Sequence, residues 1–309
     1  MNNSADVIVN QEDPQQKQSD NHDYARYKKK SQLKEFWRRI KKNKLALVGM
    51  VLFLIVILVA VFADFIVPYE TAIQQDISIK FDTPSVEHIL GTDNYGRDIF
   101  ARIVHGTRYT LMIGLAAVLI GITTGCAIGA TAGYFGGIVD TMIMRIMDTI
   151  VSIPFMLLAL TIVAALGPGL FNLVLALIVS NIPMYTRVIR SAMLNVIDMD
   201  YIEAARSCGT PDHKIILKHI LPNALGVIIV QATMTFGSMI ISASTMSFLG
   251  LGIQPPSPEW GSMLSEGKNF MLYAPHIVIF PGLAIVLTVL ALNLMGDGLR
   301  DALDPRLKD

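Results

Sequence analysis

The feature that most constrains the fold is a run of residues without a charged side chain, from Leu45 to Ala63. It comes directly after a strongly basic segment. Ten Lys and Arg residues lie between Arg26 and Lys44, so the net charge of zero conceals a marked asymmetry. A helix that crosses the hydrocarbon core of a bilayer needs about 20 mostly apolar residues. The run follows a long polar stretch without a small-residue cleavage site, unlike a secretory signal, so we expect a retained first membrane helix.

The composition argues against a water-soluble fold, which would lack enough polar residues to cover its surface. Hydrophobic residues make up 52% of the 309 residues and charged residues only 16%, whereas charged residues are about a quarter of an ordinary soluble chain. The two cysteines, Cys126 and Cys208, have no neighbours at the spacing of metal ligands. We therefore expect no disulfide framework and no metal site. We also expect that this chain has no catalytic residue and does not bind nucleic acid.

Apolar stretches of spanning length predict six membrane helices. Since lipid cannot hydrogen-bond the backbone, each span must be helical, and turns rich in Gly and Pro belong at the surfaces. The predicted fold class is an all-α, polytopic membrane protein. The expected spans are roughly Leu45 to Val67, a second within 109–139, a third and fourth sharing 149–186 with a hairpin at Gly167-Pro168-Gly169, a fifth after Pro222 and a sixth after Pro275.

Basic residues set the orientation, because they are enriched in cytoplasmic segments. The basic segment 26–44 is placed in the cytoplasm, and an even number of spans puts both termini there. Arg97, Arg102 and Arg108 then lie outside, against the rule, although Asp93 and Asp98 lie beside them. Cytoplasmic placement is also expected for Arg187, Arg190, Arg206, Lys214, Lys218, Arg300, Arg306 and Lys308.

The distribution of charged and apolar residues divides the chain into segments. Residues 1–25 have few large apolar groups, so we expect a disordered cytoplasmic tail. Residues 26–44 carry Leu33, Phe36, Trp37 and Ile40 at helical spacing among basic residues, which indicates an amphipathic interfacial helix or simply a positive flank that fixes topology. The remaining segments are a first helix (45–67), an extracytoplasmic segment (68–108), a core of five helices (109–297) with a cytoplasmic loop at 198–222, and a cytoplasmic tail (298–309).

A glycine recurs at every fourth position in the second span. A spacing of four places successive glycines along one slowly turning stripe of a helix, where two backbones can approach closely. The stripe indicates helix packing, and the same spacing suits a contact that slides between two conformations. Its members are Gly121, Gly125, Gly129 and Gly133, with Gly137 following.

The cytoplasmic loop carries start and stop signals that predict two short helices meeting at a corner. Asp200 is expected to cap the first helix with Glu203 as its capping-box partner. Gly209 is expected to end that helix in a left-handed conformation, and Thr210-Pro211 to start the next. Pro222 is then expected to restart the chain where it enters the membrane.

Several motifs resemble permease subunits of binding-protein-dependent ABC importers. In the loop these are Glu203-Ala204-Ala205, Gly209 and Leu221-Pro222. The family usually has a hydrophobic residue, often Ile, where this chain has His219; permeases of the peptide type resemble this chain in having a basic or polar residue there. The resemblance implies that the loop is a coupling helix that docks on a cytoplasmic ATPase.

Three further motifs extend the resemblance to the C-type permeases of dipeptide and oligopeptide importers, over about residues 33–306. They also admit a structural reading, in which Asp93, Arg97 and Asp98 pair and cap a surface helix. The motifs are an extracytoplasmic box of Gly91-Thr92-Asp93 and Gly96-Arg97-Asp98 with Arg102; Ser247-Phe248-Leu249-Gly250-Leu251-Gly252 followed by Pro255-Pro256 and Glu259-Trp260-Gly261; and the tail Gly296-Asp297-Gly298-Leu299-Arg300-Asp301-Ala302-Leu303-Asp304-Pro305-Arg306.

The resemblance implies a type I ABC importer permease fold in the bacterial cytoplasmic membrane. It further implies a heterodimer with a second permease, two ATPase subunits that bind ATP and Mg, and an extracytoplasmic binding protein. This chain is expected to bind no cofactor, because Gly267-Lys268 is followed by Asn269 and lacks the rest of a phosphate loop. The implied substrates are dipeptides or oligopeptides, with nickel chelates, glutathione and oligosaccharides as alternatives.

Three other functions are open to a chain of membrane helices: an intramembrane hydrolase, a secondary carrier and a scaffold. An intramembrane hydrolase using Asp297 needs a facing carboxylate, and the candidates Asp64, Asp140 and Asp148 lie near the ends of other expected helices. A secondary carrier needs ionisable groups within its spans, whereas here Arg145 and Asp148 lead into the third span and are placed to pair with each other. A membrane scaffold remains a third, less distinct alternative.

Overall fold

The computed structural model describes residues 37–303. The predicted tail 1–25, residues 26–36 of the basic segment and the last six residues, including Arg306 and Lys308, lie outside the described residues. Within 37–303 the chain is helical and has no strand, apart from one isolated bridge between Thr92 and Asp98. The prediction of an all-α fold is confirmed.

After a helical stretch at residues 37–42, the elements follow in a simple order. They are α2 (Lys44–Val61), α3 (Ala63–Ile66), α4 (Tyr69–Ile73), η1 (Ile77–Ile79), α5 (Ile99–Phe135), α6 (Gly137–Val151), α7 (Phe155–Leu166), α8 (Leu170–Ile197), α9 (Asp200–Ser207), α10 (Asp212–Lys214), η2 (Ile215–Ile220), α11 (Leu221–Phe248), α12 (Trp260–Gly267), η3 (Lys268–Phe270) and α13 (His276–Leu303).

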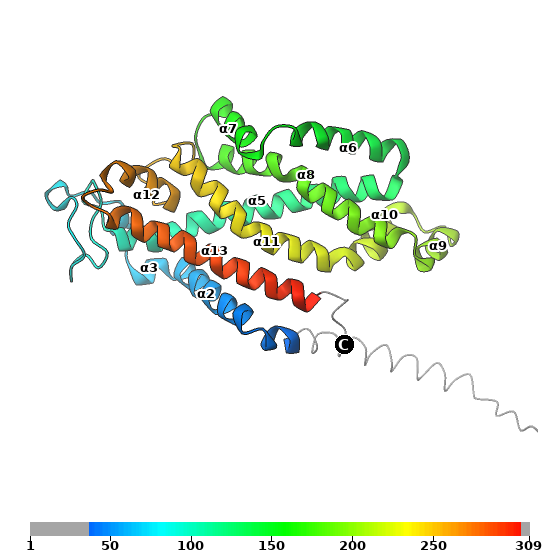
Figure 1. The fold of residues 1–309 in the computed structure, drawn as a ribbon, viewed down its shortest axis with the longest axis horizontal. Helices are drawn as coiled ribbons and strands as arrows, with labels where there is room; N and C mark the ends of the chain where they lie inside the picture. Colours follow the sequence, from blue (N-terminus) through cyan, green and yellow to red (C-terminus); the bar gives the residue numbers. More distant parts are fainter. Residues whose placement is uncertain (1–36, 304–309) are drawn as a thin grey trace, which may run out of the picture.

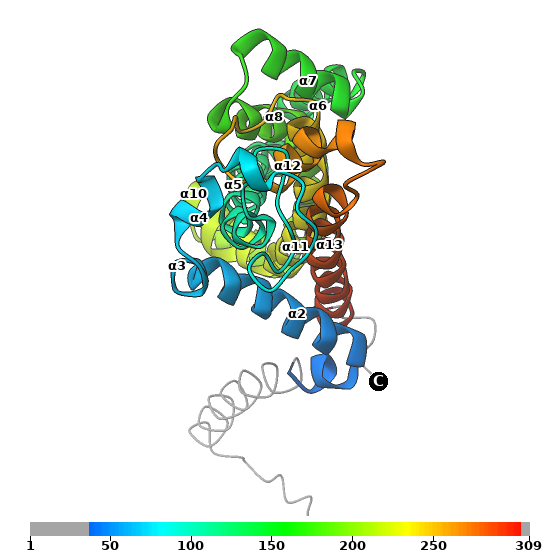
Figure 2. The same ribbon diagram turned by 90° about the vertical axis from the view of Figure 1, so that its left-hand side faces the viewer.

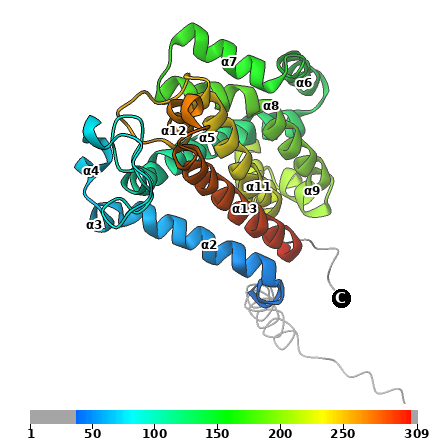
Figure 3. The same ribbon diagram turned by 60° about the vertical axis from the view of Figure 1, so that its left-hand side comes forward.

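Five helices are long and apolar enough to cross a membrane, and the pair α6 and α7, bent by 82°, makes a sixth if it is one broken span. The long helices are α2, α5, α8, α13 and a continuous helix from Asp212 to Phe248. Figure 1 shows α9 at one end of the molecule, and α3, α12 and the segment before α5 at the other. Helices α2 and α13 pack side by side, and α13 also packs on α11 (Figure 3).

The second span begins at Ile99 rather than near Tyr109. Its start is fixed by Asp98, whose carboxylate accepts a hydrogen bond from the Ala101 N–H at 2.7 Å. The extra turns carry polar groups that bond to the outer segment, since His105 Nε2 donates to the Val67 carbonyl at 2.8 Å. The apolar pattern missed these turns because they face protein rather than lipid.

The third span also differs from the expectation of one helix beginning near Thr149. Instead α6 ends at Val151, and α7 begins at Phe155 after Pro154. Proline lacks an N–H and disfavours helical backbone at the residue before it, which accounts for the bend. The expected hairpin is present: α7 ends at Leu166 and α8 begins at Leu170, with positive φ angles of 91° and 148° at Gly167 and Gly169.

The glycine stripe of α5 lies against α8, and α5 and α8 form the most extensive helix contact in the fold. A Cβ atom added at Gly121 would lie 2.7 Å from the Tyr185 ring, and one at Gly133 would lie 2.9 Å from the Met193 Cβ. Gly125 lies between them against Tyr185. Gly137 begins α6 and has open space where a side chain would be.

Replacing Gly129 by Ala should force α5 and α8 apart. The new methyl group would lie 2.6 Å from the Thr186 carbonyl oxygen, a backbone atom that cannot rotate away. Overpacking of this kind costs about 1–3 kcal/mol, so we expect a lower midpoint of thermal unfolding for the purified protein. The control is Gly226→Ala on α11, where a Cβ would meet nothing within 4 Å; equal midpoints for the two variants would contradict the packing argument.

Candidate functional site

Helix α9 is a short helix at one end of the molecule (Figure 1). Its Ile202 is fully buried and packs in an apolar cluster with Met193 of α8 and with Ile215, which follows α10. Glu203 and Ala204 lie on the exposed side of the same helix, and Ala205 is half-buried. One buried anchor therefore holds a helix whose other side is free to contact a partner.

The end of α9 is as the sequence predicted. Gly209 has φ +72°, its N–H donates to the Arg206 carbonyl at 2.9 Å, and the Thr210 N–H donates to the Ala205 carbonyl at 3.1 Å. This pair of hydrogen bonds is the Schellman motif, in which a left-handed glycine satisfies the last carbonyls of a helix.

The start of α9 differs from the prediction. Met199 is the N-cap and Asp200 is the first helical residue, and no side chain makes a capping hydrogen bond. Within the described residues Glu203 makes no side-chain hydrogen bond either, so the capping box is absent. Asp200 and Glu203 still contribute negative charge at the positive end of the helix, which is favourable without a cap.

The second half of the loop is not a separate short helix, which corrects a second expectation. Helix α10 continues through the π-helical stretch η2 into α11, so Leu221 and Pro222 lie within one long helix. Pro222 has no N–H to give to the preceding turn, and a π stretch is one way for a helix to accommodate this loss. The Leu221 N–H accordingly bonds the Ile216 carbonyl, five residues back.

Charged groups of α6 and α8 pair between these helices rather than within one. Asp148 of α6 accepts a hydrogen bond from Arg187 of α8 at 2.7 Å, so the predicted pairing of Asp148 with Arg145 is wrong. Asp140 of α6 accepts two hydrogen bonds, each of 2.5 Å, from the guanidinium of Arg190. Helices bring these groups together from residues 39 and 50 positions apart, which local spacing cannot reveal.

A buried ion cluster lies at the opposite end of the molecule. Asp93 accepts from Arg97 Nε at 2.7 Å and also pairs with Arg102. Glu266 of α12 accepts from Arg97 at 2.7 Å and lies 2.9 Å from Arg102. Both arginines are 1% exposed. The cluster joins the segment before α5, α5 itself and α12, which lie together in Figure 2.

The extracytoplasmic box predicted from the sequence surrounds this cluster. Gly91 and Gly96 have positive φ angles of 79° and 73°, and Thr92 is buried, with its hydroxyl accepting from the Asp82 N–H at 2.9 Å. Asp98 caps α5 and lies 2.8 Å from His88 Nδ1. Both parts of the structural reading, pairing and capping, are present. Sequence reasoning missed Glu266, because it lies 169 residues from Arg97 and no local motif marks it.

The Glu259-Trp260-Gly261 motif positions α12. The buried Glu259 carboxylate caps this helix by accepting from the Gly261 and Ser262 N–H groups at 2.9 and 2.8 Å. Burial raises the pKa of the Glu259 carboxyl above its ordinary value, and these two hydrogen bonds oppose the rise. Trp260 Nε1 donates to the Ile103 carbonyl at 3.0 Å, which ties α12 to α5.

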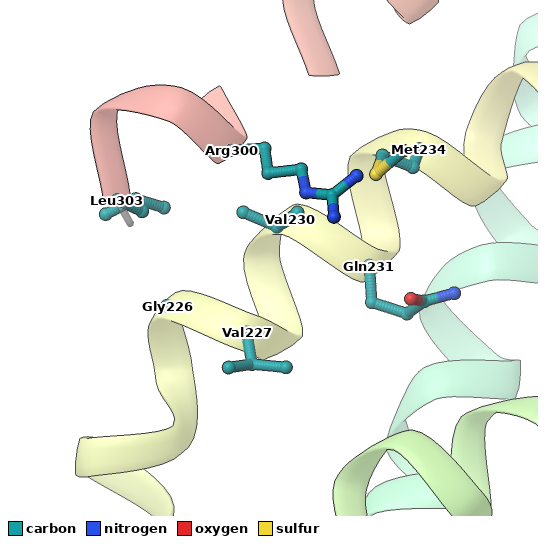
Figure 4. Close-up of a pocket in the computed structure, with 7 residues that line it drawn as sticks. All are labelled: Gly226, Val227, Val230, Gln231, Met234, Arg300 and Leu303. Atoms are coloured by element: carbon teal, nitrogen blue, oxygen red, sulfur yellow. The ribbon is translucent and has the colours of Figure 1, made fainter. Parts of the chain in front are cut away.

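A cavity of about 430 Å³ lies between the N-terminal part of α11 and the C-terminal end of α13. In Figure 4 the Arg300 side chain extends from α13 toward Val230 and Met234 of α11. No ion pair of Arg300 occurs within residues 37–303. The same residues contain no cluster of three or more potential metal ligands. Besides Arg300, the cavity is lined by Gly226, Val227, Val230, Gln231, Met234 and Leu303.

Two family models match the chain. The model described as "Binding-protein-dependent transport system inner membrane component" matches residues 121–309, and that described as "N-terminal TM domain of oligopeptide transport permease C" matches residues 31–84. Among curated proteins, the chain is 46% identical over 275 residues to the glutathione transport system permease protein GsiD of Pectobacterium atrosepticum, covering 89% of this chain and 91% of the relative. It is also 46% identical over 275 residues to the dipeptide transport system permease protein DppC of Alkalihalophilus pseudofirmus, with 89% and 90% covered.

Solved structures share the fold. An inward-facing MetNI methionine ABC transporter structure aligns with a TM-score of 0.54 at 22% identity, covering 66% of this chain and 96% of that chain. A crystal structure of an amino acid ABC transporter with histidines aligns with a TM-score of 0.52 at 18% identity, covering 65% and 94%. The shared part accounts for about two thirds of this chain, and at these identities the likeness concerns the fold alone.

Replacing Asp93 by Asn should destabilise the outer end. The change keeps the side-chain shape but leaves two buried guanidinium groups with only one carboxylate, and breaking a buried ion pair costs about 3–5 kcal/mol. We expect a clear fall in the thermal unfolding midpoint. Asp64→Asn serves as the control, because Asp64 pairs with Arg108 at an exposed site where such pairs contribute about 0–1 kcal/mol. Similar shifts in both variants would show that the cluster does not support the fold.

Proposed function

Since the chain belongs to the family of binding-protein-dependent transport system inner membrane components, we propose that it couples import to a cytoplasmic ATPase through α9. It is a multi-pass inner-membrane protein and a permease subunit of an ABC importer. The observation that carries the proposal is the position of α9, a rigidly ended helix with an exposed face at the end opposite the ion cluster (Figure 1).

The exposed face of α9 has the properties of a docking surface. Glu203 offers a carboxylate without an internal partner among the described residues, and Ala204 beside it permits close approach of another backbone. Met199 and Tyr201 add exposed apolar area next to them, and exposed apolar groups rimmed by polar ones mark interaction sites. We assign this face to an ATPase subunit, and we assign the binding of ATP and Mg to that subunit.

The outer end offers a second surface, for an extracytoplasmic binding protein. Large apolar side chains are exposed on the loops that the ion cluster holds together, including Val86, Ile89, Leu272 and Tyr273. Because the cluster fixes the segment before α5 against α12, these loops form a preorganised platform rather than separate mobile segments. A second permease would complete the pathway, of which this chain forms half.

The proposed substrates are short peptides. One relative at 46% identity is named for dipeptide transport and another for glutathione transport, and glutathione is itself a tripeptide. The shared chemistry is a short peptide with free carboxylates, which favours peptides over nickel chelates and oligosaccharides. The hydrolase alternative loses support because Asp64, Asp140 and Asp148 are each paired with an arginine.

Reversing the charge at Glu203 should separate the permease from its ATPase. With Glu203→Lys we expect co-purified ATPase to fall roughly tenfold or more, because loss of one partner of a close interfacial charge pair costs about 2 kcal/mol or more. Glu87→Lys makes the same change at an exposed position of the outer end and should leave co-purification unchanged. Equal co-purification of both variants with the ATPase would contradict the assignment of α9.

The energy source and substrate can be tested together in proteoliposomes that contain the full complex and internal ATP, with the binding protein outside. We expect uptake of a labelled dipeptide that persists when a protonophore collapses the proton gradient and stops when a non-hydrolysable ATP analogue replaces ATP. The reverse pattern would identify a secondary carrier. Uptake of a labelled nickel chelate or oligosaccharide in place of the dipeptide would correct the substrate class.

A further inference from the structure

Tyr134 connects the cytoplasmic loop directly to α5. Its hydroxyl donates a hydrogen bond to the Asp212 carboxylate at 2.6 Å, joining residues 78 positions apart. The tyrosine is only 9% exposed, so its ring is held by packing while its hydroxyl reaches the first residue of α10. A polar contact between α5 and the loop thus starts from a well-fixed side chain.

The same ring also contacts α9. The guanidinium carbon of Arg206 lies 5.0 Å from the centre of the Tyr134 ring, a distance at which a cation is attracted to an aromatic face. Tyr134 belongs to the apolar cluster that contains Ile202 of α9 and Ile215 of η2. Both sides of the loop corner therefore meet at one aromatic ring.

Tyr134 lies at the end of the glycine stripe through which α5 packs on α8. Tyr134 follows Gly133, the last glycine of the stripe, which packs on Met193 of α8. The contact between α5 and α8 extends along the stripe toward the outer half of the molecule. A displacement of the loop thus reaches, at Tyr134, the helix that makes the most extensive helix contact in the fold.

We propose that Tyr134, Asp212 and Arg206 are positioning residues that transmit movement of the α9–α10 corner to α5, as distinct from residues that bind the ATPase. This assignment rests on the proposed function and adds the internal side of the coupling site. The outward face of α9 recognises the partner, whereas Tyr134 makes the loop and α5 move as one body. Loss of its hydrogen bond should weaken coupling without weakening assembly.

The test uses the complete complex and two readouts, the amount of ATPase co-purified and the stimulation of ATP hydrolysis by the substrate-loaded binding protein. Tyr134→Phe removes only the hydroxyl, and Asp212→Leu removes the acceptor together with its charge. Each should lower the stimulation about threefold at an unchanged amount of complex. The double variant should be no worse than either single variant, because both remove the same bond.

Two variants serve as controls. Asp212→Asn keeps an oxygen that accepts the Tyr134 hydrogen bond and should retain most of the stimulation. Thr161→Val removes a hydroxyl whose hydrogen bond goes to the Leu157 carbonyl of its own helix, α7, and should behave as the wild type. Retention in Asp212→Asn together with loss in Asp212→Leu would show that the acceptor, and not the charge of Asp212, matters.

Unchanged stimulation in both Tyr134→Phe and Asp212→Leu would overturn the assignment while leaving the docking role of α9 intact. A parallel loss of complex and of stimulation would also overturn it, because that pattern identifies a contact needed only for folding. Absence of the ATPase from the wild-type complex would instead refute the proposed function, and the assignment with it.

Discussion

The close approach of α5 and α8 is the contact on which the rest of the fold depends. Between membrane helices there is little hydrophobic driving force, because lipid tails are as apolar as the side chains, so association relies on close packing. Four glycines on α5 let its backbone lie against Tyr185, Thr186 and Met193 of α8. Helix α11 packs against both α5 and α8.

Helix α5 also connects the two ends of the molecule. Its 37 residues give a length of about 55 Å at 1.5 Å per residue, with Arg102 in the ion cluster near one end and Tyr134 under the loop at the other. Ion pairs neutralise the three arginines that the sequence analysis placed outside, against the positive-inside tendency. Arg97 and Arg102 are neutralised by Asp93 and Glu266, and Arg108 by Asp64. Such pairs repay their desolvation only when geometry is good, so they specify one arrangement of the outer segment.

The sequence was sufficient where a feature depends on local chemistry. Uncharged runs predicted the spans, the Gly167-Pro168-Gly169 turn predicted the hairpin, and Gly209 predicted the end of α9. It was insufficient where a contact depends on residues that are far apart in the sequence. Asp148 pairs with Arg187 rather than with its neighbour Arg145, and Glu266 completes the outer cluster from another helix. The bend at Pro154 lay within a uniformly apolar stretch, where hydropathy alone does not separate one helix from two.

The loop shows why a continuous helix suits the proposed role better than the two short helices expected. Because α10 runs through η2 into α11, a push on the corner is passed to a helix that enters the membrane without an intervening flexible turn. The second route, through Tyr134, reaches α5. In contrast, α6 is joined to α8 by two arginine–carboxylate pairs and is separated from α7 at Pro154. In the proposed mechanism a movement of α9 is therefore transmitted along α5 and α11, whereas the bend of the fold lies in the pair α6 and α7.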